Sequence, residues 1–89
     1  MAARTDADDG AKHGFEAAVE AWVDTARPAD GAVYHAALAA FEKPLFEMAL
    51  ERTEGNQLRA ARLLGINRNT LRKRLSELDI APETFTRRR

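Results

Sequence analysis

Apolar residues recur three or four positions apart in four stretches of the chain, and short stretches containing glycine, proline or asparagine separate them. This spacing is typical of amphipathic helices. The first stretch, residues 15–26, predicts one helix, and Pro28 and Gly31 mark the connection that follows it. Residues 1–14 contain two glycines, three aspartates and little to bury, so we expect them to be disordered.

The second stretch, residues 32–53, predicts a long helix with two apolar faces. One face repeats close to a heptad and consists of Tyr34, Leu38, Phe41, Leu45 and Met48. The other face consists of Phe46, Ala49 and Leu50. Two such faces require two partners, which we expect to be the helix's own chain and a second subunit. A helix fully buried in one monomer is the alternative, but 89 residues supply too few elements to surround it. Pro44 is expected to kink this helix without ending it, because the apolar pattern resumes in phase.

A third helix is predicted over residues 57–64. Gly55 can end the preceding helix in the left-handed conformation, and Asn56 can cap the new one. Gly65 has the conformational freedom to end this short helix and to form the turn that follows it.

A last helix is predicted over residues 68–78, with Asn67 as its cap. Ala81-Pro82 is expected to end the fold, and residues 84–89 are expected to form a mobile basic tail. The chain is therefore expected to be all-α, with four helices per subunit. Its expected parts are a disordered segment (1–14), dimerisation helices (15–54), a helix-turn-helix unit (55–80) and a basic tail (81–89).

The last two predicted helices have the layout of a helix-turn-helix unit. Ala60 and Ala61 are small where two helices must cross closely, and Gly65 provides the turn between them. We expect a small shared core at this crossing, which Leu78 extends along the last helix. Its members are Leu64, Ile66, Leu71 and Leu75.

The net charge of zero hides a strong asymmetry along the chain. Residues 1–55 hold 5 of the 14 basic and 11 of the 14 acidic residues, whereas residues 56–89 have a net charge of +6. Such a split is typical of a protein that binds a polyanion with one half, although two oppositely charged solvated faces would give the same count.

Several classes of protein are not expected. The chain has no cysteine, and its two histidines, His13 and His35, have no metal-ligand spacing, so no metal or other cofactor is predicted. No apolar run is long enough to span a bilayer, and the acidic N-terminus is unlike a secretory signal, so we expect a cytoplasmic protein. The sequence offers no nucleophile–base pair and no glycine-rich phosphate loop, and an enzyme is not expected.

The outward face of the last helix carries the predicted chemistry. If the leucines point inward, the residues left outside are Arg68, Asn69, Arg72, Lys73 and Ser76. Arginine can bond guanine in bidentate fashion and asparagine can bond adenine, while both can also hold phosphates. The helix N-termini at Asn56 and Asn67 present free backbone N–H groups suited to phosphate. An ordinary charged helix surface is the alternative, but the turn, the alanine pair and the cationic face together favour DNA binding.

The segment FEKPLFEMALERTEGNQLRAARLLGINRNTLRKRLSELDI resembles the Fis-type helix-turn-helix family, and the resemblance is dense over residues 34–80. This family includes the nucleoid protein Fis and the C-terminal domains of NtrC-type response regulators. Its most specific parts here are the E-x-P-L around Pro44, the G-N-Q that begins at Gly55, the A-A pair and the run G-I-N-R-N-T-L-R-K. The R-N-T-L-R-K run and the L-D-I ending match the NtrC-type version better. The N-terminal half also lacks the hairpin-forming segment of the nucleoid protein.

The resemblance implies a homodimer in which the first two helices of each subunit form an intertwined four-helix core. The residues expected at this dimer interface are Phe15, Val19, Trp22, Leu38, Phe41, Leu45 and Met48.

The resemblance also assigns DNA contacts. Base contacts are implied for Asn67, Arg68 and Lys73, and Asn69 joins them because it replaces a glycine of Fis with an amide. Leu58 replaces a hydroxyl residue, which puts one family phosphate contact in doubt. The residues expected to contact phosphate are Asn56, Gln57, Arg59, Thr70, Arg72 and, from its charge and place, Arg74.

The favoured interpretation is therefore sequence-specific binding of double-stranded DNA by a homodimer for transcription regulation. The chain would be the DNA-binding domain of an NtrC-type nitrogen regulator of a two-component system. It would act in the bacterial cytoplasm at the nucleoid. RNA polymerase and the remaining domains of a longer regulator are candidate partners. A free-standing Fis-like architectural protein that bends DNA is the alternative, and a protein-interaction module that uses the helical dimer alone is a third hypothesis.

Overall fold

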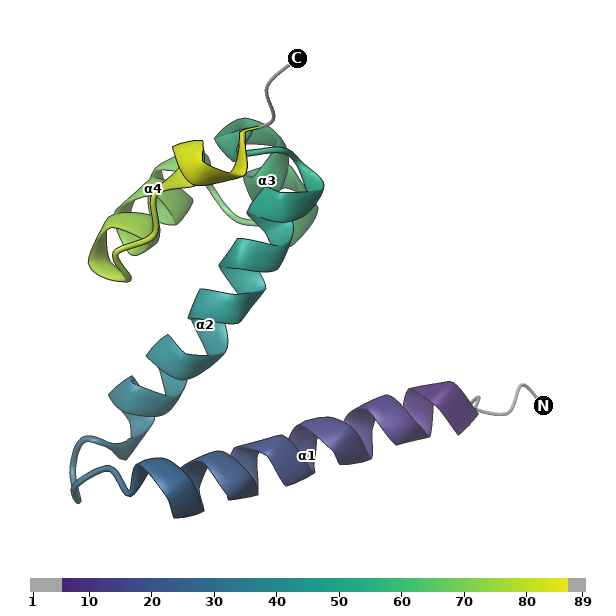
Figure 1. Cartoon of the computed structure of the whole chain (residues 1–89), viewed down its shortest axis with the longest axis vertical. Coiled ribbons are helices and arrows are strands. Elements are labelled where there is room, and N and C mark those ends of the chain that lie inside the picture. The colour runs from purple at the N-terminus through teal and green to yellow at the C-terminus, as the bar shows by residue number, and fades with distance from the viewer. Residues whose placement is uncertain (1–5, 87–89) are drawn as a thin grey trace. The chain divides into compact units, whose positions relative to one another are not determined.

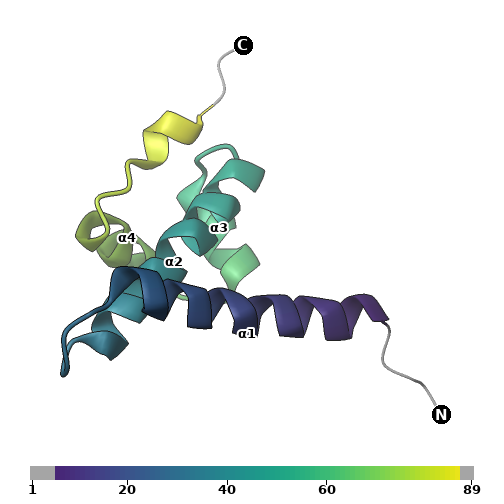
Figure 2. The same ribbon diagram turned by 60° about the horizontal axis from the view of Figure 1, so that its bottom comes forward.

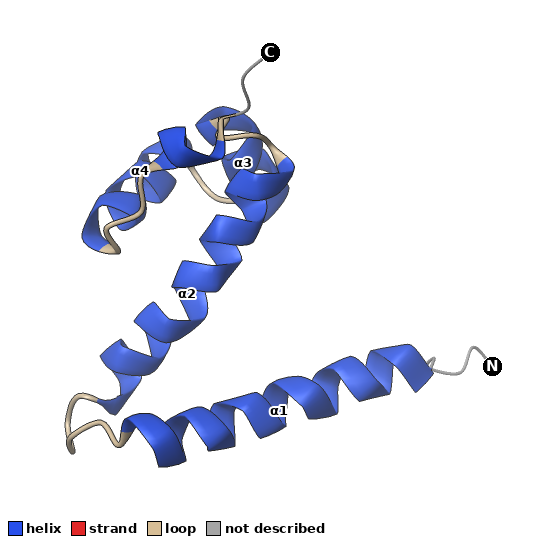
Figure 3. Ribbon diagram, in the orientation of Figure 1, coloured by secondary structure: helices blue, strands red, loops and turns tan. Residues whose placement is uncertain are grey.

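The computed structural model describes residues 6–86, and the regular elements among these residues are helices, with no strand. The elements in chain order are α1 (Asp6–Ala26), α2 (Val33–Arg52), α3 (Gln57–Leu64), α4 (Arg68–Glu77) and the short 3-10 helix η1 (Pro82–Phe85). Figures 1 and 3 show these helices and the loops that join them. The prediction of an all-α fold with four helices per subunit is confirmed. None of the helices in this part of the chain is long and apolar enough to cross a membrane.

The first helix is longer than the sequence pattern predicts. It begins at Asp6, so the expectation of disorder over residues 1–14 is wrong for residues 6–14, while residues 1–5 lie outside the described part. The expectation gave too much weight to Gly10 and Gly14. Alanine is the strongest helix former, and the alanines around these glycines can offset the cost of each glycine, about 1 kcal/mol.

The second helix agrees with its prediction to within one residue at each end, and it continues through Pro44. The expected kink at this proline stays a prediction. The chain divides into two compact units, Met1–Ala36 and Ala37–Arg89, and this boundary falls inside α2. In the first unit, apolar side chains of α1 remain exposed, with 55% exposure for Phe15 and 43% for Val19.

The second unit contains the buried core. Figures 1 and 2 show α3 and α4 grouped beside the C-terminal end of α2. The alanine pair lies buried where the helices meet, with 0% exposure for Ala60 and 2% for Ala61, as predicted. The other buried core residues are Phe46, Ala49, Leu50, Leu71, Leu75 and Ile80. The partly buried residues packed against them are Leu45, Leu64, Ile66, Leu78 and Phe85.

Each of α2, α3 and α4 ends in a left-handed residue followed by a long backward hydrogen bond of the Schellman type. After α3 the left-handed residue is Gly65 (φ 79°), as predicted, and after α4 it is Asp79 (φ 62°). After α2 the prediction named Gly55 alone, but Glu54 (φ 55°) takes this conformation first and Gly55 (φ 83°) second. The backward bonds run from the amides of Gly55, Ile66 and Ile80 to the carbonyls of Leu50 (2.9 Å), Ala61 (3.0 Å) and Leu75 (2.8 Å) respectively.

Replacing Asp79 with glycine is expected to stabilise the fold. A left-handed conformation strains a residue that has a Cβ by about 1–2 kcal/mol, and glycine relieves this strain. The greater entropy of glycine in the unfolded chain offsets part of the stability gained in this way. We therefore expect Asp79→Gly to raise the free energy of unfolding by about 0.5–1 kcal/mol in urea denaturation. The converse change, Gly65→Ala, should lower it by at least about 1 kcal/mol. A lower stability of Asp79→Gly would show that the aspartate side chain contributes more than the strain removes.

The fold continues beyond Ala81-Pro82, where the sequence predicted its end. Residues 82–85 form η1, and the side chain of Phe85 packs against the core. A Cβ added at Gly55 would lie 2.7 Å from Oγ1 of Thr86 and 2.8 Å from the carbonyl oxygen of Pro82, so this segment closes over the turn after α2. The expected mobile tail is therefore wrong for residues 84–86, and residues 87–89 lie outside the described part.

Candidate nucleic-acid interface

Both predicted helix caps are present at the helix-turn-helix unit. Oδ1 of Asn56 accepts a hydrogen bond from the amide of Arg59 (3.0 Å), and Oδ1 of Asn67 accepts one from the amide of Asn69 (2.7 Å). Each cap takes one of the two acceptor sites of Oδ1 and fixes the orientation of that amide, whereas the side-chain amide of Asn69 caps no helix. Bidentate pairing with adenine needs both an acceptor and a donor on one amide. Asn69 is therefore better suited than Asn67 to read adenine.

The outward face of α4 is the one that the sequence predicts. Leu71 and Leu75 are buried, and the remaining positions from Arg68 to Lys73 are exposed. Among the described residues the ion pairs join His13 to Glu16 and Arg74 to Glu42 and Glu77, so none involves the other cations of α4. Those unpaired cations of the recognition face are Arg68, Arg72 and Lys73. Their charge is available to an anion outside the protein.

Arg74 pairs with carboxylates of its own chain, and its expected role as a phosphate contact stays a prediction. Its Nε donates to Oε1 of Glu42 (2.9 Å), and its two terminal nitrogens bind Glu42 and Glu77. The hydrogen bond to Glu42, and then that to Glu77, raises the pKa of Arg74, while partial burial opposes this shift. Arg74 therefore joins α4 to α2. Glu77, three positions away, was visible in the sequence as a partner, but Glu42 lies 32 positions away and was not.

Replacing Arg74 with methionine separates these two roles. The change leaves the carboxylate of Glu42, which is only 16% exposed, without its main partner. We expect a loss of about 1–2 kcal/mol in the free energy of unfolding. The salt dependence of DNA binding, measured where the variant is folded, should stay unchanged. A flatter salt dependence would instead support Arg74 as a phosphate contact.

The expected phosphate contacts fall into two places. Asn56, Gln57 and Arg59 occupy the start of α3, where Asn56 and Arg59 are exposed and Gln57 is half-buried. Arg72 is exposed on α4, whereas Thr70 lines a separate groove of about 210 Å³. Phe41, Glu42, Leu45, Phe46, Leu64, Ile66 and Arg74 line the rest of that groove. Thr70 thus lies beside residues of α2 as well as on the helix-turn-helix unit.

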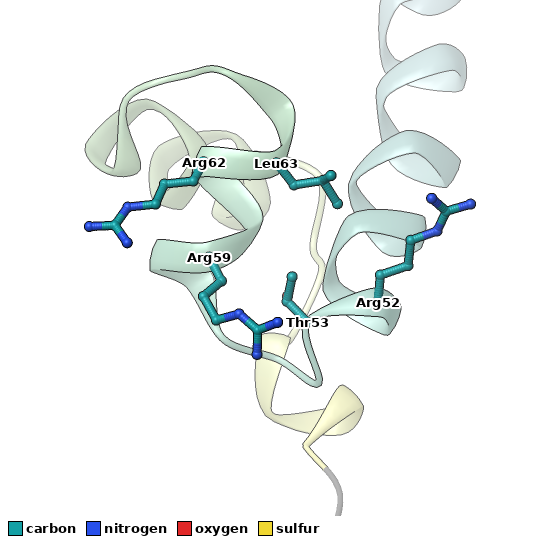
Figure 4. Close-up of a pocket in the computed structure, with 5 residues that line it drawn as sticks. All are labelled: Arg52, Thr53, Arg59, Arg62 and Leu63. Atoms are coloured by element: carbon teal, nitrogen blue, oxygen red, sulfur yellow. The ribbon is translucent and has the colours of Figure 1, made fainter.

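Two arginines that the sequence reasoning did not assign lie beside this region, Arg52 at the end of α2 and Arg62 in the last turn of α3. Arg52 and Arg62 line a groove of about 470 Å³ with Thr53, Arg59 and Leu63, as Figure 4 shows. The three-residue spacing of Arg59 and Arg62 on one helix was a signal available in the sequence. The approach of Arg52 from α2 was not. No group of three or more histidine, aspartate or glutamate side chains that could hold a metal occurs in the part of the chain that the structure describes.

Comparison with known proteins shows what the segment that carries this site is similar to. Residues 37–78 match the model described as bacterial regulatory protein, Fis family. The DNA-binding transcriptional regulator NtrC of Bradyrhizobium sp. (strain RP501 Parasponia) is 58% identical over 48 residues, which cover 54% of this chain and 10% of that protein. NtrC of Azospirillum brasilense is 51% identical over 53 residues, covering 60% of this chain and 11% of that protein.

The DNA-binding protein Fis of Buchnera aphidicola subsp. Acyrthosiphon pisum (strain 5A) is also similar. It is 53% identical over 45 residues, which cover 51% of this chain and 46% of that protein. The matched segment thus spans about a tenth of the NtrC relatives and about half of the Fis relative. A comparison with solved structures gave no match.

Proposed function

Because residues 37–78 form a helix-turn-helix DNA-binding domain of the Fis family, we propose that this chain binds specific sequences of double-stranded DNA as a homodimer and regulates transcription. The observation that carries the proposal is the exposed N-terminal half of α4. It presents Arg68, Arg72 and Lys73 without an ion pair among the described residues, together with the amide of Asn69. Recognition helices place this half against base edges in the major groove.

Exposed apolar side chains support the homodimer. Phe41 is 45% exposed, and with Leu45 it lines the mostly apolar groove on α2, which a second subunit would fill. Leu38 and Met48 are half-buried on the same helix. In the first unit Phe15 and Val19 are exposed and Trp22 is half-buried, so α1 also has apolar surface left to cover. Exposed large apolar side chains that cluster on one helix are typical of interfaces.

Within the family we propose the DNA-binding domain of an NtrC-type nitrogen regulator, acting in the bacterial cytoplasm at the nucleoid. The identity of 58% to an NtrC relative and the R-N-T-L-R-K run support this choice. The remaining domains of such a regulator and RNA polymerase would be its protein partners. A free-standing Fis-like architectural protein is the alternative, favoured by the larger share of the Fis relative that the match covers. Strong bending of DNA with little sequence preference would support that alternative.

A titration of the whole chain against a duplex selected for binding and a scrambled duplex, at two salt concentrations, tests the proposal. We expect tighter binding to the selected duplex and weaker binding to both at higher salt. Each phosphate contact adds about 0.9 to the slope of log affinity against log salt. Equal affinity for both duplexes would contradict specific binding, and no binding to either would contradict the function as a whole.

Two further variants test the expected phosphate contacts. Arg59→Ala and Arg72→Ala should each flatten the salt slope by about 1.8 for a dimer, from about 0.9 per lost contact in each subunit. They should weaken binding to all duplexes similarly, because phosphate contacts carry no sequence information. Lys43→Ala, which removes an exposed cation of α2, is the matched control and should leave the slope unchanged. If both arginine variants kept the original slope, the phosphate assignments would be wrong.

A further inference from the structure

The groove beside α3 is positively charged, and its cations do not belong to the recognition helix α4. Its lining residues include three arginines, Arg52, Arg59 and Arg62, and no carboxylate. All three are exposed, and no ion pair in the described part of the chain involves any of them. The groove of about 470 Å³ therefore carries a positive charge that no carboxylate of its lining offsets.

The remaining lining residues add no base-reading chemistry. The hydroxyl of Thr53 is buried and lies within hydrogen-bond distance of the carbonyl oxygens of Ala49 (2.9 Å) and Asn56 (3.1 Å). Leu63 offers only an apolar surface. The groove can therefore recognise charge through guanidinium groups, which pair well with phosphate oxygens.

The directions of the arginines decide between a compact and an extended anion. Figure 4 shows their side chains pointing away from one another instead of converging on one spot. Arg59 and Arg62 are also separated along α3 by three residues, a rise of about 4.5 Å. A single phosphate could not contact all three guanidinium groups, whereas the backbone of a nucleic acid offers a row of phosphates.

We propose that Arg52 and Arg62 bind the phosphate backbone of DNA that flanks the sequence read by α4. This inference rests on the proposed function and extends its contact surface. Arg59 connects the two regions, because it lies at the capped start of α3 and also lines the groove. Flanking DNA reaches the groove when the duplex bends toward α3, so the contact adds affinity only on duplexes long enough to bend.

The test compares a duplex that ends at the edges of the selected sequence with one extended by about 10 base pairs, one helical turn, on each side. The whole chain should bind the extended duplex more tightly. The double variant Arg52→Ala/Arg62→Ala should bind the extended duplex about tenfold or more weakly, with a salt slope lower by up to about 3.6 for a dimer. Its affinity for the short duplex should change less than about twofold, since that duplex holds none of the lost contacts.

Two control variants keep the comparison interpretable. Lys43→Ala should bind both duplexes like the original chain, because Lys43 does not line the groove. Arg52→Lys/Arg62→Lys should keep most of the affinity for the extended duplex, since phosphate accepts a point charge. Equal urea midpoints and the same helical circular dichroism would show that all variants are folded.

An equal loss on both duplexes would overturn the inference, because the arginines would then act at the core sequence. Unchanged binding of the double variant to the extended duplex would also overturn it and would leave another occupant, such as an acidic protein. In that case the salt-dependent binding of the original chain and the effect of Arg72→Ala would still support the proposed function. Failure of the original chain to bind either duplex would instead refute the proposed function itself.

Discussion

Replacing Phe41 with glutamate is expected to convert the dimer into a monomer or an unfolded chain. Phe41 is 45% exposed in the single chain and lies on a mostly apolar groove that the proposed second subunit covers. Burying a further carboxylate there costs several kcal/mol, more than a small dimer interface can offset, because the cation of the groove lining, Arg74, is already paired with Glu42 and Glu77. Sedimentation at micromolar concentration measures the change, and Leu45→Glu should have the same effect.

A matched control uses a neighbouring position on the same helix. Lys43 is exposed two residues away, so Lys43→Glu introduces the same carboxylate without placing it in the groove. This variant should remain a folded dimer. A folded monomer of the unmodified chain at micromolar concentration would contradict the proposed dimer, as would an unchanged dimer of Phe41→Glu.

Replacing Arg68 with alanine is expected to produce the largest loss of DNA specificity. Arg68 is the first residue of α4, is exposed, and has no ion pair among the described residues. Its planar guanidinium matches the two acceptors of a guanine edge. The variant should lose about 1–3 kcal/mol for each half-site contact and should relax the preference at one base position per half-site.

Affinities for duplexes that each carry one substituted base pair measure this preference. Arg68→Lys keeps the charge but loses the fork, so it should recover general affinity and leave the preference relaxed. Asn69→Gly should relax a second position if its free amide reads a base. Arg68 could instead hold a phosphate. Identical base preferences of the unmodified chain and Arg68→Ala would establish that alternative and refute the guanine role.

The sequence predicted the elements whose signals are local. Asn56 caps the start of α3, and Gly65 ends the helix in a left-handed conformation. Each residue acts on backbone groups that lie within a few positions of it in the sequence. The inward leucines of α4 determine which side chains face outward, so the cationic face could also be predicted. The two leucines that carry this argument are Leu71 and Leu75.

The missed features depend on contacts between segments far apart in the sequence. Phe85 stabilises η1 by packing against the core. No local sequence pattern predicts this contact. The pairing of Arg74 with Glu42 and the place of Arg52 in the lining of the same groove as Arg59 likewise depend on the folded arrangement. Glu54 takes a left-handed conformation that a sequence rule assigns to glycine, and the amide of the next residue, Gly55, bonds back to the carbonyl of Leu50.

Selection of bound duplexes from a random pool by the whole chain tests the central proposal most directly. A dimer with one recognition helix per subunit should enrich a motif with two-fold symmetry, because operator symmetry follows protein symmetry. The complex with the enriched duplex should contain two chains per duplex. Recovery of duplexes with no common motif, or of complexes with a single chain, would contradict sequence-specific binding by a homodimer.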